Sequence, residues 1–306
     1  MKRTLLFTLM FLFAMLAKAQ QPDFHAGFHN VIPAVEPDFK DVNYAGDDLE
    51  AHRLDIYLPK TGQKSYKAVI AIYGSAWFSN NMKAITYFSL GKPLIDAGFA
   101  VICINHRAST DAKFPAQIQD VKGVIRFIRA NKEKFKIDDS FIGITGFSSG
   151  GHLSAMAGVT NGMKTFKGVD IEGNVGGNEN FSSRVDAVVD WFGPVDMAHM
   201  ENCTEPKDDK SPEAVLIGGD PRVMTDMVKV ISPVYYMKNK KNMPQFVVIH
   251  GDADDVVPYC QSKILSEALQ KIGKLTEFVT VPNGKHGPVT FNEQTYKTMV
   301  DFFKKF

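Results

Sequence analysis

Short, nearly continuous apolar runs recur along this chain, and segments with helical spacing of apolar residues separate them. Residues 67–73 ("KAVIAIY"), 99–105 ("FAVICIN") and 141–145 ("FIGIT") leave almost no polar face, which is typical of strands covered on both sides. Residues 185–192 ("VDAVVDWF") and 245–251 ("QFVVIHG") are also strand-like. This alternation predicts the α/β class, with a mainly parallel central sheet and helices on both of its faces.

The remaining elements extend this pattern toward both ends of the chain. Residues 53–59 ("RLDIYLP") form a short run that alternates apolar and polar side chains, so we expect an antiparallel edge there. Residues 118–135, 262–273 and 293–306 have the apolar spacing of helices, and residues 276–282 that of a strand.

We expect one domain over residues 20–306, because no internal repeat and no long linker interrupts the pattern. The chain has 306 residues, of which 44% are hydrophobic, enough to bury one large core. Residues 193–243 are the least regular, with prolines, glycines and the charged run "EPKDDK". Long irregular insertions in compact domains are often lids or binding loops, so this segment is predicted to be a cap over one side of a site.

The start of the chain has the pattern of a secretory signal peptide. Two basic residues precede an apolar stretch at 5–16, and Ala17 to Ala19 fit a small-x-small cleavage site. The apolar stretch is too short to span a bilayer comfortably, which makes a membrane anchor the weaker alternative. We therefore expect residues 1–19 to be removed and the mature chain, beginning near Gln20, to be periplasmic or secreted.

Charge and cysteine content argue against several other kinds of protein. The net charge is +1 and no basic run stands out, so we expect neither nucleic acid nor an anionic membrane as a partner. The spacing of the three cysteines fits no zinc site; Cys103 is predicted to be a buried apolar residue, and pairing of Cys203 with Cys260 stays open. No phosphate-binding loop or dinucleotide fingerprint is found, so no cofactor and no metal is predicted.

The stretch "GFSSGG" (146–151) follows the strand-like run at 141–145 and precedes an expected helix from Ser149 to Ala157. It matches G-x-S-x-G, in which a serine nucleophile lies on a sharp turn between strand and helix and small neighbours let the backbone pass closely. The helix N-terminus also favours negative charge that develops nearby. Ser148 is therefore the candidate nucleophile, and a flexible glycine-rich turn is the alternative.

A serine hydroxyl needs a base, and this chain offers acids and a histidine in the required order. Asp252, Asp254 and Asp255 follow the strand-like run at 245–251, and His286 follows the last predicted strand. We predict His286 as the general base and Asp254 as the acid that orients its imidazole, with Asp255 as the alternative acid. A surface-loop histidine and turn-forming aspartates are the structural alternatives.

Acyl transfer also needs N–H donors for the oxyanion of the tetrahedral intermediate. One is expected from Ser149, which follows the nucleophile, and the other from the loop after the strand at 67–73. In that loop Gly74, Ser75 and Ala76 are small enough for the backbone to approach the site. The predicted oxyanion hole therefore consists of the Ser149 and Ser75 N–H groups, with Gly74 shaping the turn. An ordinary strand-end turn is the alternative.

These motifs together resemble the α/β-hydrolase esterases of the BD-FAE type, which are secreted or periplasmic acetylxylan and feruloyl esterases. The family's G-x-S-A-G-G corresponds to 146–151, its H-G-x-x-D-x-x-V-P to 250–258 and its G-x-H loop to 284–286. The resemblance runs from about Asp41 to the C-terminus. It implies the α/β-hydrolase fold, and it supports Asp254 as the acid.

The chain departs from the family in the oxyanion loop, where the family's H-G-G-x-W appears as the five residues from Tyr73 to Trp77. Because the donors are backbone groups, the hole survives such changes, although the added serine side chain strains the turn or narrows the acyl pocket. Trp77 itself either walls that pocket or packs at the sheet edge. His152 and His250 are expected to be structural, and Arg107 to bind a loop or pair with an acid.

The resulting prediction is an exported serine carboxylesterase that forms an acyl-enzyme on a small-molecule or polysaccharide ester. The resemblance implies acetyl or feruloyl groups on plant polysaccharide. A serine peptidase or amidase on the same fold is the nearer alternative, and a non-catalytic binding protein on a hydrolase scaffold is the more distant one. The sequence leaves the oligomeric state open.

Overall fold

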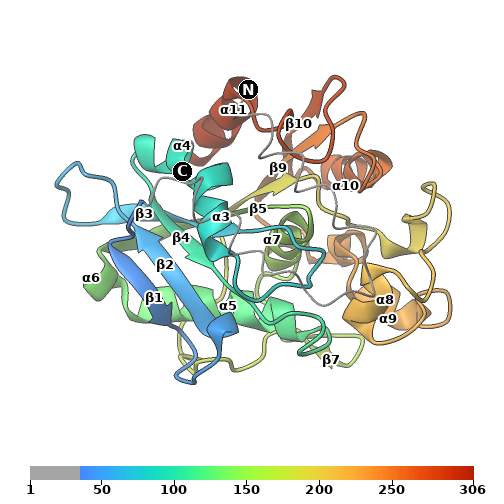
Figure 1. The fold of residues 1–306 in the computed structure, drawn as a ribbon, viewed down its shortest axis with the longest axis horizontal. Helices are drawn as coiled ribbons and strands as arrows, with labels where there is room; N and C mark the ends of the chain where they lie inside the picture. The colour runs from blue at the N-terminus through green and yellow to red at the C-terminus, as the bar shows by residue number, and fades with distance from the viewer. Residues whose placement is uncertain (1–34) are drawn as a thin grey trace. The chain divides into compact units, whose positions relative to one another are not determined.

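An eight-stranded sheet organises residues Asp38–Phe306 of the computed structural model, which describes residues 35–306 (Figure 1). The predicted signal peptide and the cleavage point near Gln20 lie outside the described residues. The strands are β1 (Phe39–Asn43), β2 (Arg53–Tyr57), β3 (Tyr66–Ile72), β4 (Ala100–Ile104), β5 (Ile137–Phe147), β8 (Ala187–Trp191), β9 (Gln245–Gly251) and β10 (Leu275–Val281). Their order across the sheet is β1-β2-β4-β3-β5-β8-β9-β10.

The sheet is parallel from β4 to β10, which confirms the parallel core expected from the apolar runs. β1 and β2 are antiparallel to each other, and β2 is antiparallel to β4, so the antiparallel edge is confirmed as well. In Figure 1 these two blue strands lie at one edge of the sheet and the orange β10 at the other.

Helices cover both faces of the sheet because alternate side chains of each central strand point to opposite sides. Ile70 and Ile72 of β3 join the apolar cluster of one face, and Val69 and Ala71 join that of the other. The first face is covered by α5 (Ala116–Ala130), α7 (Ser149–Val159) and α10 (Cys260–Lys271). The second is covered by α3 (Lys83–Thr86), η3 (Tyr87–Gly91), α4 (Lys92–Asp96) and α11 (Glu293–Phe303).

Short elements fill the connections between strands and helices. They are η2 (Glu50–His52), α6 (Lys132–Phe135) and the small hairpin of β6 (Thr165–Phe166) with β7 (Val169–Asp170). Within residues 35–306, no helix has both the length and the apolar character needed to cross a membrane.

Residues 193–243, expected to be irregular, contain several short helices. They are η4 (Met197–His199), α8 (Pro212–Ile217), α9 (Thr225–Val230) and η5 (Pro233–Asn239). The start of α8 follows from local chemistry, because the Ser211 hydroxyl accepts a hydrogen bond from the Ala214 N–H and Pro212 opens the first turn. It ends at Gly218, whose φ of 81° is the left-handed conformation that glycine adopts without strain.

The topology fixes where a site can form. Because β3, β5, β9 and β10 are parallel, the loops that follow them all leave the sheet at its carboxyl edge. In open α/β sheets this edge is the usual place for a ligand. These four loops, together with Ser149 at the start of α7, hold every predicted site residue.

Candidate active site

Ser148 lies in a strained turn between the end of β5 and the start of α7. Its φ of 56° and ψ of −125° are rare for a residue with a side chain. Glycines on both sides make the turn possible, because neither position has room for a side chain. A Cβ at Gly146 would lie 2.3 Å from the Gly150 carbonyl oxygen, and a Cβ at Gly150 would lie 2.3 Å from the Ile72 carbonyl oxygen. The sequence therefore folds here into the strand–turn–helix that a nucleophile elbow needs.

The loop after β10 brings His286 to this serine. His286 Nε2 lies 2.9 Å from Ser148 Oγ, and His286 Nδ1 lies 2.7 Å from Asp254 Oδ2 in the loop after β9. Because Nδ1 faces a carboxylate, it carries the ring proton in the neutral imidazole, which leaves Nε2 free to accept the Ser148 proton. The three predicted residues thus lie in hydrogen-bonded sequence, and their arrangement is that of a serine nucleophile with its base and orienting acid.

The Asp254 carboxylate is fully buried and receives four hydrogen bonds. The Val256 and Val257 N–H groups donate to Oδ1, and the rings of His286 and His250 donate to Oδ2. Burial alone raises the pKa of this carboxyl, but the hydrogen bonds and charge of the two histidines outweigh burial and hold the pKa well below its usual range. Asp254 is therefore ionised where it contacts the imidazole of His286.

The other aspartates of this loop face elsewhere. Asp255 is exposed, and its carboxylate lies 3.6 Å from Lys285 Nζ. Asp252 accepts a hydrogen bond from the Asn283 N–H. Of the three acids considered from the sequence, Asp254 is the one that contacts His286.

The loop after β3 passes directly beside the nucleophile. A Cβ at Gly74 would lie 2.6 Å from Ser148 Cβ, so this position has no room for a side chain. Ser75 follows, and its N–H donates to Ser149 Oγ at 2.9 Å. The Ser75 N–H is one of the two predicted oxyanion donors. It therefore already donates to the hydroxyl of Ser149, the residue whose N–H is the other predicted donor.

Trp77 is 2% exposed and closes the same loop against α7. Its indole N–H donates to His152 Nδ1 at 3.2 Å, and His152 Nε2 lies 2.7 Å from the Ile231 carbonyl oxygen. Burial lowers the pKa of His152 to about 4, with partial compensation from its bond to Ile231, so the ring is neutral. This environment favours the packing role for Trp77 that the sequence left open. Arg107 pairs with Asp120 at 2.6 Å, which confirms the predicted pairing with an acid.

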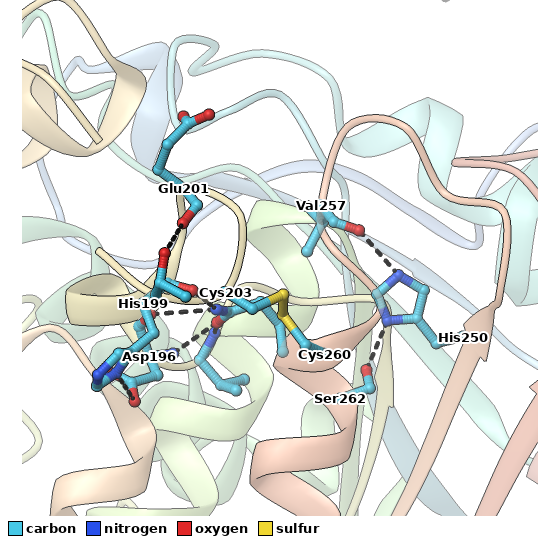
Figure 2. Close-up of a disulfide and its surroundings, with 11 residues drawn as sticks. Asp196, His199, Glu201, Cys203, His250, Val257, Cys260 and Ser262 are labelled. Atoms are coloured by element: carbon cyan, nitrogen blue, oxygen red, sulfur yellow. Dashed lines mark hydrogen bonds and ion pairs between the residues drawn. A yellow bond between two sulfur atoms is a disulfide. The ribbon is translucent and has the colours of Figure 1, made fainter. Parts of the chain in front are cut away.

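A disulfide joins Cys203 of the 193–243 segment to Cys260 in the first turn of α10, with the Cα atoms 6.2 Å apart (Figure 2). The sequence left this pairing open. Beside it, Gln261 accepts hydrogen bonds from the N–H groups of Val195 and Asp196 and donates to the carbonyl oxygens of Asp196 and His199. The first turn of α10 therefore fastens the beginning of this segment.

His250 was expected from the sequence to be structural, but its contact with the predicted acid was not expected. Its ring lies against the carboxylate of Asp254. The motif H-G-x-x-D places the two residues four positions apart, and that spacing was the available signal. Among residues 35–306, no cluster of three or more histidine, cysteine, aspartate or glutamate side chains is arranged to hold a metal ion.

Comparison with known proteins gives consistent results. The BD-FAE family profile matches residues 54–269. The esterase LipC of Mycobacterium tuberculosis is 30% identical over 244 residues, which cover 79% of this chain and 58% of LipC. The chain spans about half the length of the curated relatives it matches.

Solved structures resemble this one over most of its length. A bifunctional GH43-CE protein of Bacteroides eggerthii is 60% identical, with a TM-score of 0.85 over 87% of this chain and 35% of that one. A truncated form of a carbohydrate esterase from gut microbiota is 58% identical, with a TM-score of 0.85 over 87% of this chain and 95% of that one. The mostly parallel sheet between two helical layers is the α/β-hydrolase fold, as expected from the sequence.

Proposed function

Because this chain belongs to the BD-FAE family, we propose that it is a carboxylic ester hydrolase that uses Ser148, His286 and Asp254 as a catalytic triad. One observation carries the proposal: Ser148 Oγ lies 2.9 Å from an imidazole whose other nitrogen lies 2.7 Å from a buried carboxylate. A serine hydroxyl with this partner becomes a nucleophile at neutral pH.

The first half of the reaction forms an acyl-enzyme. Ser148 Oγ bonds to the ester carbonyl carbon while its proton passes to His286 Nε2, and the carbonyl electron pair moves onto oxygen. The Ser149 N–H at the start of α7 and a donor from the Gly74–Ser75 loop stabilise this oxyanion. The oxyanion then collapses, the bond to the alcohol breaks, and His286 gives its proton to the leaving oxygen.

The second half releases the acid. Water attacks the acyl carbon while His286 takes one of its protons, and a second tetrahedral oxyanion forms in the same hole. Its collapse breaks the bond to Ser148 Oγ, which recovers the proton from His286. Throughout both halves, Asp254 stabilises the imidazolium and keeps the ring in its working orientation.

We propose acetyl or feruloyl esters on plant polysaccharide as the substrates, and export as the route to them. The BD-FAE resemblance supports the substrate class, as does the 58% identical structure that is named as a carbohydrate esterase from gut microbiota. The disulfide supports export because disulfides persist in oxidising compartments. Residues 193–243, fastened next to the site by Cys203 and Gln261, serve as the cap in this proposal.

The proposal is tested by measuring acetate released from acetylated xylan and ferulate released from feruloylated arabinoxylan, with Ser148→Ala beside the unchanged protein. We expect release of at least one acid, and a loss of several orders of magnitude in the variant. Faster cleavage of a matched anilide than of the ester would favour an amidase instead. Equal rates for both proteins, or no turnover of any ester, would contradict the assignment.

Export has its own test, which is N-terminal sequencing of the protein recovered after expression in a bacterium with a secretory pathway. We expect the mature chain to begin near Gln20. A protein that retains Met1 and stays in the cytoplasm would contradict this part of the proposal.

A further inference from the structure

His250 is a fully buried histidine for which the mechanism above has no role. It lies near the end of β9, and its ring is held on two sides (Figure 2). Nε2 lies 3.1 Å from Asp254 Oδ2 and 3.2 Å from the Val257 carbonyl oxygen. Nδ1 lies 2.7 Å from the hydroxyl oxygen of Ser262 in α10.

These contacts fix where the ring proton lies. Nε2 faces two acceptors, a carboxylate and a carbonyl, so it must carry a hydrogen. In the neutral ring Nδ1 is then an acceptor, and the Ser262 hydroxyl is the donor that fits it. Because Ser262 is also fully buried, no water competes for this bond. Ser262 therefore selects the tautomer of His250 that can donate to Asp254.

Two imidazoles share one oxygen of the acid. Asp254 Oδ2 receives Nδ1–H of His286 at 2.7 Å and Nε2–H of His250 at 3.1 Å, while the backbone of Val256 and Val257 holds Oδ1. The carboxylate is thus fixed from four directions and has little freedom to rotate away from His286. The neighbouring charges, Asp255 and Lys285, pair with each other at the surface.

We propose that His250 and Ser262 form a positioning pair that orients the Asp254 carboxylate toward His286. This inference rests on the proposed triad and adds two residues to it, neither of which contacts the substrate in the proposed reaction. Ser262 adjoins Gln261 and is close to Cys260, so the turn of α10 that holds His250 is the turn that fastens residues 193–243. The same turn of α10 therefore contacts both the segment 193–243 and, through His250, the carboxylate of Asp254.

The side-chain geometry of asparagine and glutamine separates the two contacts of His250. The amide of His250→Gln reaches about as far as Nε2 and can still donate to Asp254. The amide of His250→Asn reaches only about as far as Nδ1, so it contacts Ser262, and Asp254 Oδ2 keeps His286 as its one ring donor. We expect His250→Asn to lose roughly 100-fold in kcat with KM changed less than about three-fold, and His250→Gln to stay within roughly ten-fold.

The pH profile of kcat/KM supplies a readout that simple packing damage does not move. A carboxylate that rotates away from Nδ1 of His286 stabilises its imidazolium less. The acidic limb of the profile should therefore move to lower pH in His250→Asn, by about half a unit or more, and should stay in place in His250→Gln. Ser262→Ala removes the tautomer-setting donor and should give a shift in the same direction but smaller.

His52→Asn is the matched control, because His52 is also buried and bonded to carboxylates, those of Asp47 and Asp120. It directly precedes β2, which lies next to the edge strand β1, on the opposite side of the sheet from β9. We expect it to lower thermal stability and to leave the pH profile unchanged. Thermal unfolding of every variant identifies any that fail to fold, and Ser262→Ala then carries the test.

The inference is overturned if His250→Asn and His250→Gln fall equally with an unmoved acidic limb, or if both match the unchanged protein. Its failure is distinguishable from failure of the triad. If Ser148→Ala remains active, the proposed function is wrong. If Ser148→Ala is inactive while His250→Asn and Ser262→Ala keep the normal rate and profile, only the positioning pair is wrong.

Discussion

The oxyanion loop shows how one hydroxyl group affects a proposed reaction. The Ser149 Oγ occupies the Ser75 N–H, which we propose as an oxyanion donor, so the oxyanion has to compete with Ser149 for it. Ser149→Ala removes the competitor and leaves the backbone donors in place. We expect kcat on a small acetate ester to rise by up to about five-fold, because one neutral hydrogen bond contributes a free energy of about that factor. KM should change little.

The outcome of that substitution discriminates between two roles for the bond. A ten-fold or larger fall in kcat would mean that the bond holds the loop in its working position. The Ser75 N–H would then not be an oxyanion donor, and another donor of the loop would take its place.

Asp190 gives a prediction for pH dependence. It is fully buried on β8; the Gly193 N–H donates to Oδ1, and nothing within residues 35–306 donates to Oδ2. Burial raises its pKa to about 7, against a smaller lowering by the bond from Gly193. An acid with a higher pKa in the fold than in the unfolded chain stabilises the fold at low pH, and this stability is lost as pH rises through the folded pKa.

Asp190→Asn removes that titration while keeping the shape of the side chain. Between pH 5 and pH 8, the unchanged protein should lose roughly 2 kcal/mol of unfolding free energy relative to the variant, as measured by urea denaturation at both pH values. A constant difference between the two proteins across this range would show that Asp190 does not titrate there.

At the same scale, the sequence predicted that three of these residues meet but did not predict every contact around them, for a physical reason. Ser148, Asp254 and His286 follow strands of a parallel sheet, so chain order alone predicts that they meet at one edge. The contact of His250 with Asp254 depends on the direction of a buried ring. The contact of Ser149 with Ser75 depends on one rotamer. Neither the direction of the ring nor the rotamer follows from the spacing or the type of the residues.

At the scale of elements, the 193–243 segment shows where pattern reading stops. Its helices α8 and α9 have six residues each, too few for an apolar period to stand out from the surrounding prolines and glycines. Tertiary bonds hold the segment instead, among them the four hydrogen bonds of Gln261 and the disulfide from Cys203 to Cys260.

Removing the disulfide should therefore destabilise the protein measurably. It joins residues that are 57 positions apart in the sequence. Removing such a cross-link gives the unfolded chain more conformational freedom, which typically lowers the free energy of unfolding by roughly 2–4 kcal/mol. We expect this loss in the double variant Cys203→Ser, Cys260→Ser, measured by urea unfolding. A reductant should destabilise the unchanged protein and leave the double variant unaffected. Equal stability of the two oxidised proteins would contradict the prediction.

At the scale of the whole molecule, the apolar runs predicted the parallel sheet because a strand buried on both faces has little room for polar residues. They did not predict that β4 lies between β2 and β3, or that β8 lies beside β5, because strand order depends on which edges pair and every central run is similarly apolar. The family resemblance implied the α/β-hydrolase fold as a whole, and the order of the strands comes from the structure.

Ser148 is the activated nucleophile of the proposed reaction, and covalent trapping tests this role directly. The protein is incubated with a fluorophosphonate, whose phosphorus bonds to an activated serine oxygen as fluoride leaves, and the modified peptide is mapped by mass spectrometry. We predict a single adduct on Ser148, absent from Ser148→Ala and from heat-unfolded protein. An adduct on Ser149 or Ser75, or no adduct on the folded protein, would contradict the account.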